Sequence, residues 1–423
     1  MNIDKLLLYK VDENSTLYRF AALIEKAKNH EVDSKECYDL LSKLINFGLE
    51  HGFYDNLWHC YITYIMVYNE NSYSMNCEMK GMGKGTLESI ADHDFEILKE
   101  LFDFDINDFG IDMDMDSILE FSNDNLKGRV FNKRISDNIC ELSNNLEKCD
   151  SVAEFKDQVV DFYKRFGVGI LGLHKAFRLS DDGEITPITG IAHVSLDDLC
   201  GYENQKKKLM DNTNAFVAGR KANNCLLYGD AGTGKSTSIK AIANMYYDKG
   251  VRIIEIYKHQ FKYINKIISK IKNRNYYFIL YMDDLSFEEF EIEYKYLKAV
   301  IEGGLEKKPS NILIYATSNR RHLIRESFKD NTEVNDLHKS DTKQEKLSLA
   351  DRFGVTIYYG APTPKEFKQI VLALRDNNNI DMDDDEILLE ANKWELHHNG
   401  LSGRTAQQFI DYLLGFNDLN ERN

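Results

Sequence analysis

The spacing of apolar residues predicts a helical first part of the chain. Apolar residues recur there three and four positions apart, as they do on one face of an α-helix. Ser34 can cap one such helix. The two clearest apolar stripes are Cys37, Leu40, Leu41, Leu44, Ile45 and Leu49, and then Leu87, Ile90, Ala91, Ile97, Leu98, Leu101 and Phe102. Such stripes are typical of a buried core, so we expect a mainly helical N-terminal domain over residues 1–166.

The pattern changes beyond Asn223, where short β-rich runs alternate with helical spacing. The expected strands are Cys225–Tyr228, Val251–Tyr257, Tyr277–Met282, Ile312–Ala316 and Val355–Tyr359. Helical patterns separate them at Ile239–Tyr246, Phe261–Ile271 and Tyr294–Leu305. Strands joined in this way form right-handed crossovers and a parallel sheet with helices on both faces. We therefore predict an α/β fold with a parallel five-stranded sheet.

A hairpin signal lies between these two parts. Leu171–Leu179 and Glu184–Ile188 flank Asp181-Asp182-Gly183, and glycine tolerates the positive φ of a tight turn. Past Pro362 the chain is helical again, as a small lid would be. We expect the helical domain over 1–166, a hairpin and hinge over 167–194, the α/β core over 195–361 and a helical lid over 362–423.

Composition and charge exclude several classes of protein. Of the 423 residues 43% are hydrophobic, and no run approaches the roughly 18 apolar residues that cross a membrane. The N-terminus lacks the basic start and apolar stretch of a signal peptide, and the seven cysteines form no C-x-x-C pair. We expect a cytoplasmic protein with reduced cysteines and no membrane partner. The net charge of −16 argues against a broad basic face for duplex DNA.

One motif predicts a phosphate-binding loop. Residues Gly229, Asp230, Ala231, Gly232, Thr233, Gly234, Lys235 and Ser236 match G-x-x-x-x-G-K-[ST] at every position, and Thr237 follows. The glycines let successive N–H groups point at phosphate oxygens beside the start of a helix. Lys235 would reach the β- and γ-phosphates and Ser236 would ligate Mg²⁺. Because the motif lies between a predicted strand and a predicted helix, we expect binding of ATP with Mg²⁺.

Two further strand ends carry polar residues. The apolar run Phe278–Met282 ends in Asp283 and Asp284, and carboxyl ends of parallel strands gather at one edge of a sheet. Asp283 is the expected Mg²⁺ partner. Asp284 is the candidate general base, with Glu288 or Glu289 as alternatives.

The strand Ile312–Ala316 runs into Thr317-Ser318-Asn319. A polar amide at this end can orient an attacking water near the γ-phosphate. We therefore expect Asn319 to belong to the same site.

The order of these motifs resembles that of AAA+ ATPases, and Leu349–Phe353 and Ser402–Ala406 continue it. The chain is most similar to an uncharacterised bacterial AAA+ family known only as a domain of unknown function. The strings that carry this resemblance are Leu199–Gln205, Ala222–Asn224, Asp283–Glu288, Ala316–His322, Glu345–Gly354 and Ser402–Ala406.

The resemblance implies roles for further residues. Arg352 resembles the arginine finger that reaches a neighbouring subunit, with Arg320 and Arg321 as rival candidates. Arg404 resembles the sensor arginine of the lid. The segment Leu199–Tyr202, with Gly201 and Tyr202, resembles the part that frames adenine. A homo-oligomeric ring or partial ring is therefore expected. The base position departs from the family pattern, because Asp284 stands where most AAA+ proteins have Glu.

Two functional hypotheses follow. The first is an ATPase motor that hydrolyses ATP at subunit interfaces and acts on an unidentified macromolecule, protein or DNA. The second is a nucleotide-gated switch or scaffold with slow hydrolysis and a partner-binding N-terminal domain, which the shorter Asp284 favours. The order of the sensor, finger and lid motifs disfavours a small-molecule kinase.

The basic segment Lys258–Arg274, with Phe261 and Tyr263 interleaved, allows two interpretations. It could stack and neutralise nucleic acid. We favour a solvated helix face, because clustered lysines commonly have that role.

Overall fold

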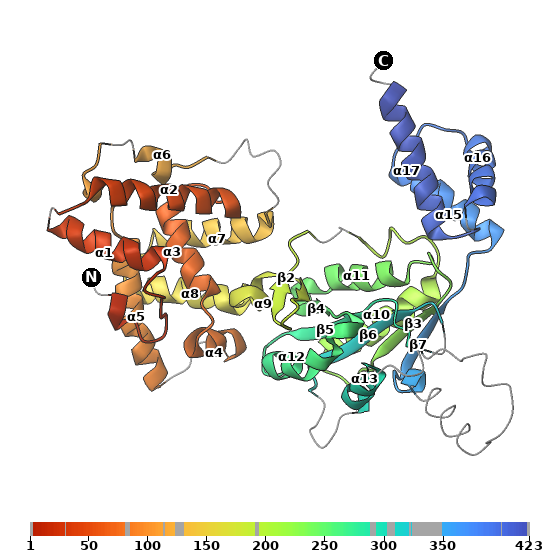
Figure 1. The fold of residues 1–423 in the computed structure, drawn as a ribbon, viewed down its shortest axis with the longest axis horizontal. Coiled ribbons are helices and arrows are strands. Elements are labelled where there is room, and N and C mark those ends of the chain that lie inside the picture. Colours follow the sequence, from red (N-terminus) through yellow and green to blue (C-terminus); the bar gives the residue numbers. More distant parts are fainter. Residues whose placement is uncertain are drawn as a thin grey trace. The chain divides into compact units, whose positions relative to one another are not determined.

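We describe a computed structural model of the protein (Figure 1), which defines residues 3–29, 31–80, 85–112, 115–122, 131–190, 194–287, 293–302, 309–320, 323, 349–398 and 400–420. Contacts divide the chain into two units, Met1–His174 and Lys175–Asn423. Within the described ranges, no helix combines the length and the apolarity that crossing a membrane requires.

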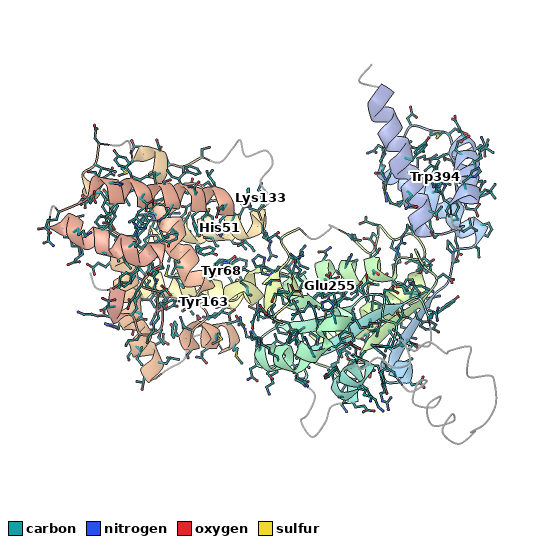
Figure 2. The ribbon with its side chains drawn as sticks, viewed as in Figure 1. His51, Tyr68, Lys133, Tyr163, Glu255 and Trp394 are labelled. Atoms are coloured by element: carbon teal, nitrogen blue, oxygen red, sulfur yellow. The ribbon has the colours of Figure 1, made fainter. Side chains whose placement is uncertain are left out.

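The first unit is built from helices that share one core. They are η1 (Ile3–Lys5), α1 (Thr16–Lys28), α2 (Ser34–His51), α3 (Leu57–Tyr68), α4 (Ser72–Lys80), α5 (Thr86–Phe102), η2 (Ile106–Phe109), α6 (Asp116–Leu119), α7 (Lys133–Leu146), α8 (Val152–Phe166) and α9 (Gly169–Leu173). Local signals start them, as at α8, where Ser151 and Glu154 form a reciprocal capping box. Trp58 is fully buried in this core, as is Tyr163 (Figure 2). The mainly helical character predicted for this region is confirmed.

The second unit contains a sheet of seven strands in the order β2-β1-β4-β5-β6-β3-β7. Its strands are β1 (Ala176–Leu179), β2 (Ile185–Pro187), β3 (Cys225–Gly229), β4 (Val251–Glu255), β5 (Tyr277–Met282), β6 (Ile312–Ser318) and β7 (Val355–Tyr359). All neighbouring pairs are parallel except β1 with β2. Each of the five strands expected from the sequence is present at its predicted place.

The prediction of five strands is wrong in number, because the hairpin joins the sheet. Strand β1 pairs parallel with β4, placing Ala176 opposite Ile253 and Phe177 opposite Ile254. Phe177 is fully buried there. A two-stranded hairpin is marginal in water on its own, and pairing with β4 gives β1 a second hydrogen-bonded neighbour and buries Phe177. The first hairpin strand also begins later than expected, at Ala176, because helix α9 occupies the residues before it.

Helices cover both faces of this sheet, with α11 on one side and α12 and α13 on the other (Figure 1). The helices of this part are α10 (Glu203–Val217), α11 (Lys235–Met245), η3 (Tyr247–Lys249), η4 (Lys258–Tyr263), α12 (Ile264–Ile271) and α13 (Glu293–Glu302). The interior strand β6 is buried along its whole length, as expected of a parallel sheet covered on both faces. This arrangement leaves the carboxyl ends of the strands as the edge where polar side chains can gather.

Three helices end the chain: α15 (Pro364–Asn377), α16 (Asp384–His397) and α17 (Gly403–Asn420). Pro364 stands in the first turn of α15, whose capping box joins Thr363 and Glu366. The three helices share a small core of their own. At its rim the ring of Trp394 (Figure 2) stacks on the ring of His398, with 4.0 Å between the ring centroids. We call α15–α17 the C-terminal helical segment.

Candidate functional site

The loop between β3 and α11 depends on glycine at its two ends. Gly229 has φ 134°, and a Cβ there would stand 2.1 Å from the carbonyl oxygen of Tyr359. Gly234 has φ 87°, and its Cβ would stand 2.3 Å from a methyl group of Leu199. Both positions therefore require glycine, for conformation and for space. The loop so formed turns directly into the first residue of α11, Lys235.

The side chain of Lys235 folds back over this loop. Its Nζ donates to the carbonyl oxygens of Gly229 at 3.0 Å and of Asp230 at 2.6 Å. Burial lowers the pKa of the Lys235 ammonium, although the nearby carboxylates of Asp230, Asp284 and Asp283 oppose that shift. The ammonium is thus held at the loop, beside the N-terminal end of a helix, where N–H groups and the helix dipole favour an anion.

Asp283 connects the loop helix to two strand ends. Its Oδ1 accepts hydrogen bonds from Ser236 Oγ at 2.7 Å and from Thr317 Oγ1 at 2.5 Å. Burial alone would raise the pKa of Asp283, but these hydrogen bonds outweigh it and lower the pKa below its ordinary value. The carboxyl group is therefore ionised at neutral pH. An ionised carboxylate beside two hydroxyl groups is a set of hard oxygen donors, which suits Mg²⁺.

Asp284 lies beside this cluster and is held by two contacts. Asn319 Nδ2 donates to Asp284 Oδ1 at 2.9 Å, and the Asp284 amide donates to Thr317 Oγ1, also at 2.9 Å. The Asp284 backbone has φ 47°, an uncommon conformation for a residue other than glycine. The hydroxyl group of Thr317 therefore contacts both Asp283 and the Asp284 amide, and Asn319 joins the group through Asp284.

These groups line one cavity of about 840 Å³ in the second unit. The predicted site residues among its lining are Tyr202, Ala231, Gly232, Thr233, Gly234, Lys235, Ser236, Thr237, Asp283, Asp284, Asn319 and Arg404. Most of the residues singled out from the sequence therefore meet in one place, although they come from the strand ends, the loop helix and the C-terminal helical segment.

Four predicted residues are not among the described lining of the cavity: Gly201, Gly229, Asp230 and Arg352. Gly229 and Asp230 instead anchor the loop, since the Asp230 amide donates to Tyr359 O at 2.9 Å. Asp230 Oδ2 also accepts from the amide of Ala361 at 2.7 Å. Gly201 has φ 80° and immediately precedes Tyr202. Gly229 and Asp230 therefore hold the loop in place without lining the cavity.

Arg352 pairs with an acidic residue of its own chain. Its Nη2 lies 2.6 Å from Oε1 of Glu302, at the end of α13, and the two side chains are 27% and 43% exposed. Of the rival arginines, Arg320 is exposed, and its backbone amide donates to Ser318 Oγ at 3.2 Å. Arg321 and the alternative bases Glu288 and Glu289 lie outside the described residues.

The C-terminal helical segment meets the loop through the start of α17. The Arg404 amide donates to the carbonyl oxygen of Gly232 at 3.2 Å. On another wall of the cavity, Tyr202 donates its hydroxyl to Gly360 O at 2.8 Å and packs against the ring of Tyr359. Burial raises the pKa of Tyr202 to about 12, so the group remains a neutral donor.

No site role was expected from the sequence for several lining residues: Val194, Asp198, Thr317, Ile370, Leu374, Gly403, Gln407, Gln408 and Asp411. One signal was available for part of this set. Arg404, Gln407, Gln408 and Asp411 stand three and four positions apart, which places them on one face of a helix. No comparable signal exists for Thr317, whose role depends on its neighbours on another strand.

The basic segment Lys258–Arg274 makes contacts within its own unit. Lys266 and Lys270 both pair with Glu184 of the β1–β2 hairpin. Tyr263 donates its hydroxyl to Asp181 O at 3.1 Å, and Phe261 is buried. These contacts contradict the base-stacking interpretation, because the aromatic rings and two of the lysines are used within the fold. The preferred interpretation, a solvated helix face, is confirmed for Lys262, Lys266 and Lys270, which are exposed.

Comparison with known proteins gives a family and a distant structural likeness. No curated protein matches the chain. Among solved structures, the Thermotoga maritima RuvB Holliday junction branch migration motor is 16% identical, with a TM-score of 0.31, covering 52% of this chain and 72% of that one. A mutant of T. maritima RuvB is likewise 16% identical over the same shares, with a TM-score of 0.33.

The family match is more extensive. Residues 173–417 match the family described as "Protein of unknown function (DUF815)". That range is more than half of the chain and contains every described residue of the cavity lining. The resemblance to a family of unknown function, noted from the sequence, is confirmed: the chain belongs to the family described as "Protein of unknown function (DUF815)".

Proposed function

We propose that this protein is an AAA+ ATPase that binds ATP with Mg²⁺ and hydrolyses it where two subunits meet. The observation that carries the proposal is the Asp283 cluster beside the phosphate loop. There an ionised carboxylate, the Ser236 hydroxyl and the buried Lys235 ammonium converge on one cavity. Positive charge, N–H groups and oxygen donors in that arrangement are what a Mg²⁺–triphosphate group requires.

Each end of the site has a distinct task in this proposal. Lys235 and the first N–H groups of α11 bind the phosphates, and Ser236 and Asp283 hold Mg²⁺. The metal, when bound, neutralises charge on the phosphate oxygens. Gly201 and Tyr202 belong to the part that frames adenine, with Tyr202 on the cavity wall. Arg404 enters the cavity from the C-terminal helical segment and contacts phosphate of the same chain.

Asp284 and Asn319 are the groups placed to handle the attacking water. A carboxylate within hydrogen-bond reach of water can take its proton as the nucleophile attacks phosphorus. The hydrogen bond from Asn319 holds Asp284 in one orientation, and the amide has a second N–H left to orient the water. Asp284 is shorter by one methylene than the usual Glu, so we expect slow turnover.

Arg352 points to an oligomer. It is not part of the described cavity lining of its own chain and pairs with Glu302 instead. An arginine that serves as a finger acts from a neighbouring subunit and contributes about 10³–10⁵ in rate. We therefore propose that the protein forms a homo-oligomeric ring or partial ring in the cytoplasm and acts on a protein or DNA substrate.

A second candidate function is a nucleotide-gated switch or scaffold. The observation that favours it is Asp284 itself, which is short and already hydrogen-bonded by Asn319 through Oδ1. In that case ATP binding would assemble the protein, and hydrolysis would only reset it.

The decisive experiment measures ATP hydrolysis against protein concentration for the wild type and for Arg352→Ala, with ATP binding measured alongside. We expect the rate per subunit to rise with concentration, and to fall by about 10³-fold or more in the variant while binding persists. Arg220→Ala, an exposed arginine of the same unit, serves as the matched control. Arg320→Ala tests the rival finger. Binding without turnover in the wild type at every concentration would favour the switch.

A further inference from the structure

Helix α17 contributes several residues to the lining of the cavity. Its start lies against the loop, where the Arg404 amide bonds to Gly232. Gln407, Gln408 and Asp411 follow on the lining of the same cavity. With about 1.5 Å of rise per residue, Asp411 lies about 10 Å farther along the helix axis than Arg404. Successive turns of α17 therefore face successive parts of whatever the cavity holds.

The chemistry of the wall changes along this direction. The loop end carries Lys235 and Ser236, whereas other walls carry Leu199, Ile370 and Leu374. A nucleoside triphosphate has its phosphates, its sugar and its base in that order. When the phosphates lie at the loop, the later turns of α17 lie beside the sugar, and the apolar wall is left for the base.

Gln407 and Asp411 form a pair on this face. Gln407 Nε2 donates to Asp411 Oδ1 at 2.8 Å, one helical turn apart. A carboxylate accepts several hydrogen bonds, and the amide retains one N–H and its carbonyl oxygen. A carboxylate repels phosphate, so this pair does not suit the triphosphate. A vicinal diol, with two hydroxyl groups that both donate and accept, suits it well, and carboxylates bind ribose hydroxyls in other nucleotide folds.

The other carboxylates of the described lining are used differently. Asp198 Oδ2 accepts from the amide of Ser195 at 2.7 Å. Asp283 and Asp284 belong to the metal and water end of the site. Asp411 is therefore the remaining carboxylate of the described lining that can contact the sugar.

We propose that Gln407 and Asp411 bind the ribose hydroxyls and make the site select ribonucleotides over deoxyribonucleotides. This inference rests on the proposed binding of ATP, which it deepens by naming the sugar that the site accepts. Hydrogen bonds to a charged group contribute about 1.5–3 kcal/mol, and each 1.4 kcal/mol is about tenfold in affinity. The wild type is therefore expected to bind ATP about tenfold more tightly than 2′-deoxy-ATP.

The test is equilibrium binding of ATP, 2′-deoxy-ATP and 3′-deoxy-ATP to the full chain. Asp411→Ala and Gln407→Ala are expected to weaken ATP binding to the level of the deoxynucleotides, with little change in 2′-deoxy-ATP binding. Gln408→Ala, on the same cavity face but outside the pair, should keep the preference. Glu395→Ala, a partly exposed carboxylate on α16, controls for loss of charge. Asp411→Asn retains the side-chain size and should show an intermediate preference if the carboxylate is the acceptor.

Three outcomes would overturn the inference. Equal wild-type affinity for ATP and both deoxynucleotides would overturn it while leaving the proposed function intact. An Asp411→Ala variant that still prefers ATP tenfold would do the same. Failure of the wild type to bind any of the three nucleotides would overturn the proposed function and this inference with it.

Discussion

The two units hold their hydrogen-bonded carboxylates in opposite ways. In the first unit, Asp94 is fully buried and accepts hydrogen bonds from the amides of Leu7, Leu8 and Tyr9. In the second, Asp283 accepts from the hydroxyls of Ser236 and Thr317 and lies on a cavity. The first carboxylate is enclosed by its own backbone partners, whereas the second remains available to a ligand.

Other groups of the first unit repeat this closed pattern. Lys156 pairs with Glu88 at 2.9 Å and with Asp92 at 2.5 Å. The hydroxyls of Tyr9 and Tyr163 lie 2.8 Å apart. Burial of a charged or polar group thus does not identify a functional site by itself, because a satisfied network stabilises the fold equally well. Burial beside an open cavity is the more informative combination.

The strongest test of this contrast is Asp283→Asn. We expect Mg²⁺-dependent ATP hydrolysis to fall about 10³-fold, or about 4 kcal/mol, because the metal loses its charged ligand. ATP binding in the presence of a chelator should change little. The measurement is steady-state phosphate release, with Asp92→Asn of the first unit as the control. Hydrolysis within tenfold of the wild type would show that Asp283 is as structural as Asp94.

The next largest effect concerns acid stability of the first unit. Burial lowers the pKa of His59 from 6.5 to about 4, with only partial opposition from Asp103. Its ring stacks on Phe102 at 3.9 Å. The unfolded chain therefore binds a proton at a higher pH than the folded chain does. Stability contributed by neutral His59 is complete above pH 6.5 and is lost as the pH falls from 6.5 to about 4.

The expected loss is about 3 kcal/mol over that range. Denaturant unfolding of the first unit, followed against pH, measures it. His59→Gln should flatten the dependence, whereas His93→Gln, which bonds to Lys5 O near the surface, should leave it unchanged. A wild-type stability that is constant between pH 6.5 and 4 would contradict the prediction.

The smallest effect is expected at Thr317. Thr317→Val keeps the shape of the side chain but removes the hydroxyl that contacts Asp283 and the Asp284 amide. We expect turnover to fall about tenfold, since the hydrogen bonds contribute about 1–2 kcal/mol to positioning. Thr186→Val is the matched control, because Thr186 bonds only to Arg178 O on the hairpin among its described contacts. Unchanged turnover in Thr317→Val would remove Thr317 from the site.

The outcome for the basic segment shows where local reasoning is weakest. Its lysines and aromatic residues were visible in the sequence, but Glu184 and Asp181, which contact them, lie about 80 positions away. Lys266 and Lys270, which look unpaired in the sequence, form ion pairs with Glu184 on the distant hairpin. Such a partner cannot be read from spacing, because residue spacing reports only which side chains share one element.

The sequence alone determined the elements and the location of the phosphate loop. Strand β5 has the predicted bounds, Tyr277–Met282, and the loop begins at the end of β3 as expected. These features depend on apolar periodicity and on glycine at positions of positive φ, and both are properties of short segments.

Only the tertiary structure decided how those elements share edges and contacts. It added the hairpin to the sheet through β1 and β4, made Thr317 the common partner of Asp283 and Asp284, and placed Gln407 and Asp411 on the cavity. It also paired Arg352 with Glu302. Each of these contacts joins segments whose own patterns would permit other partners. The choice among those partners is made by burial and hydrogen bonding over the whole unit.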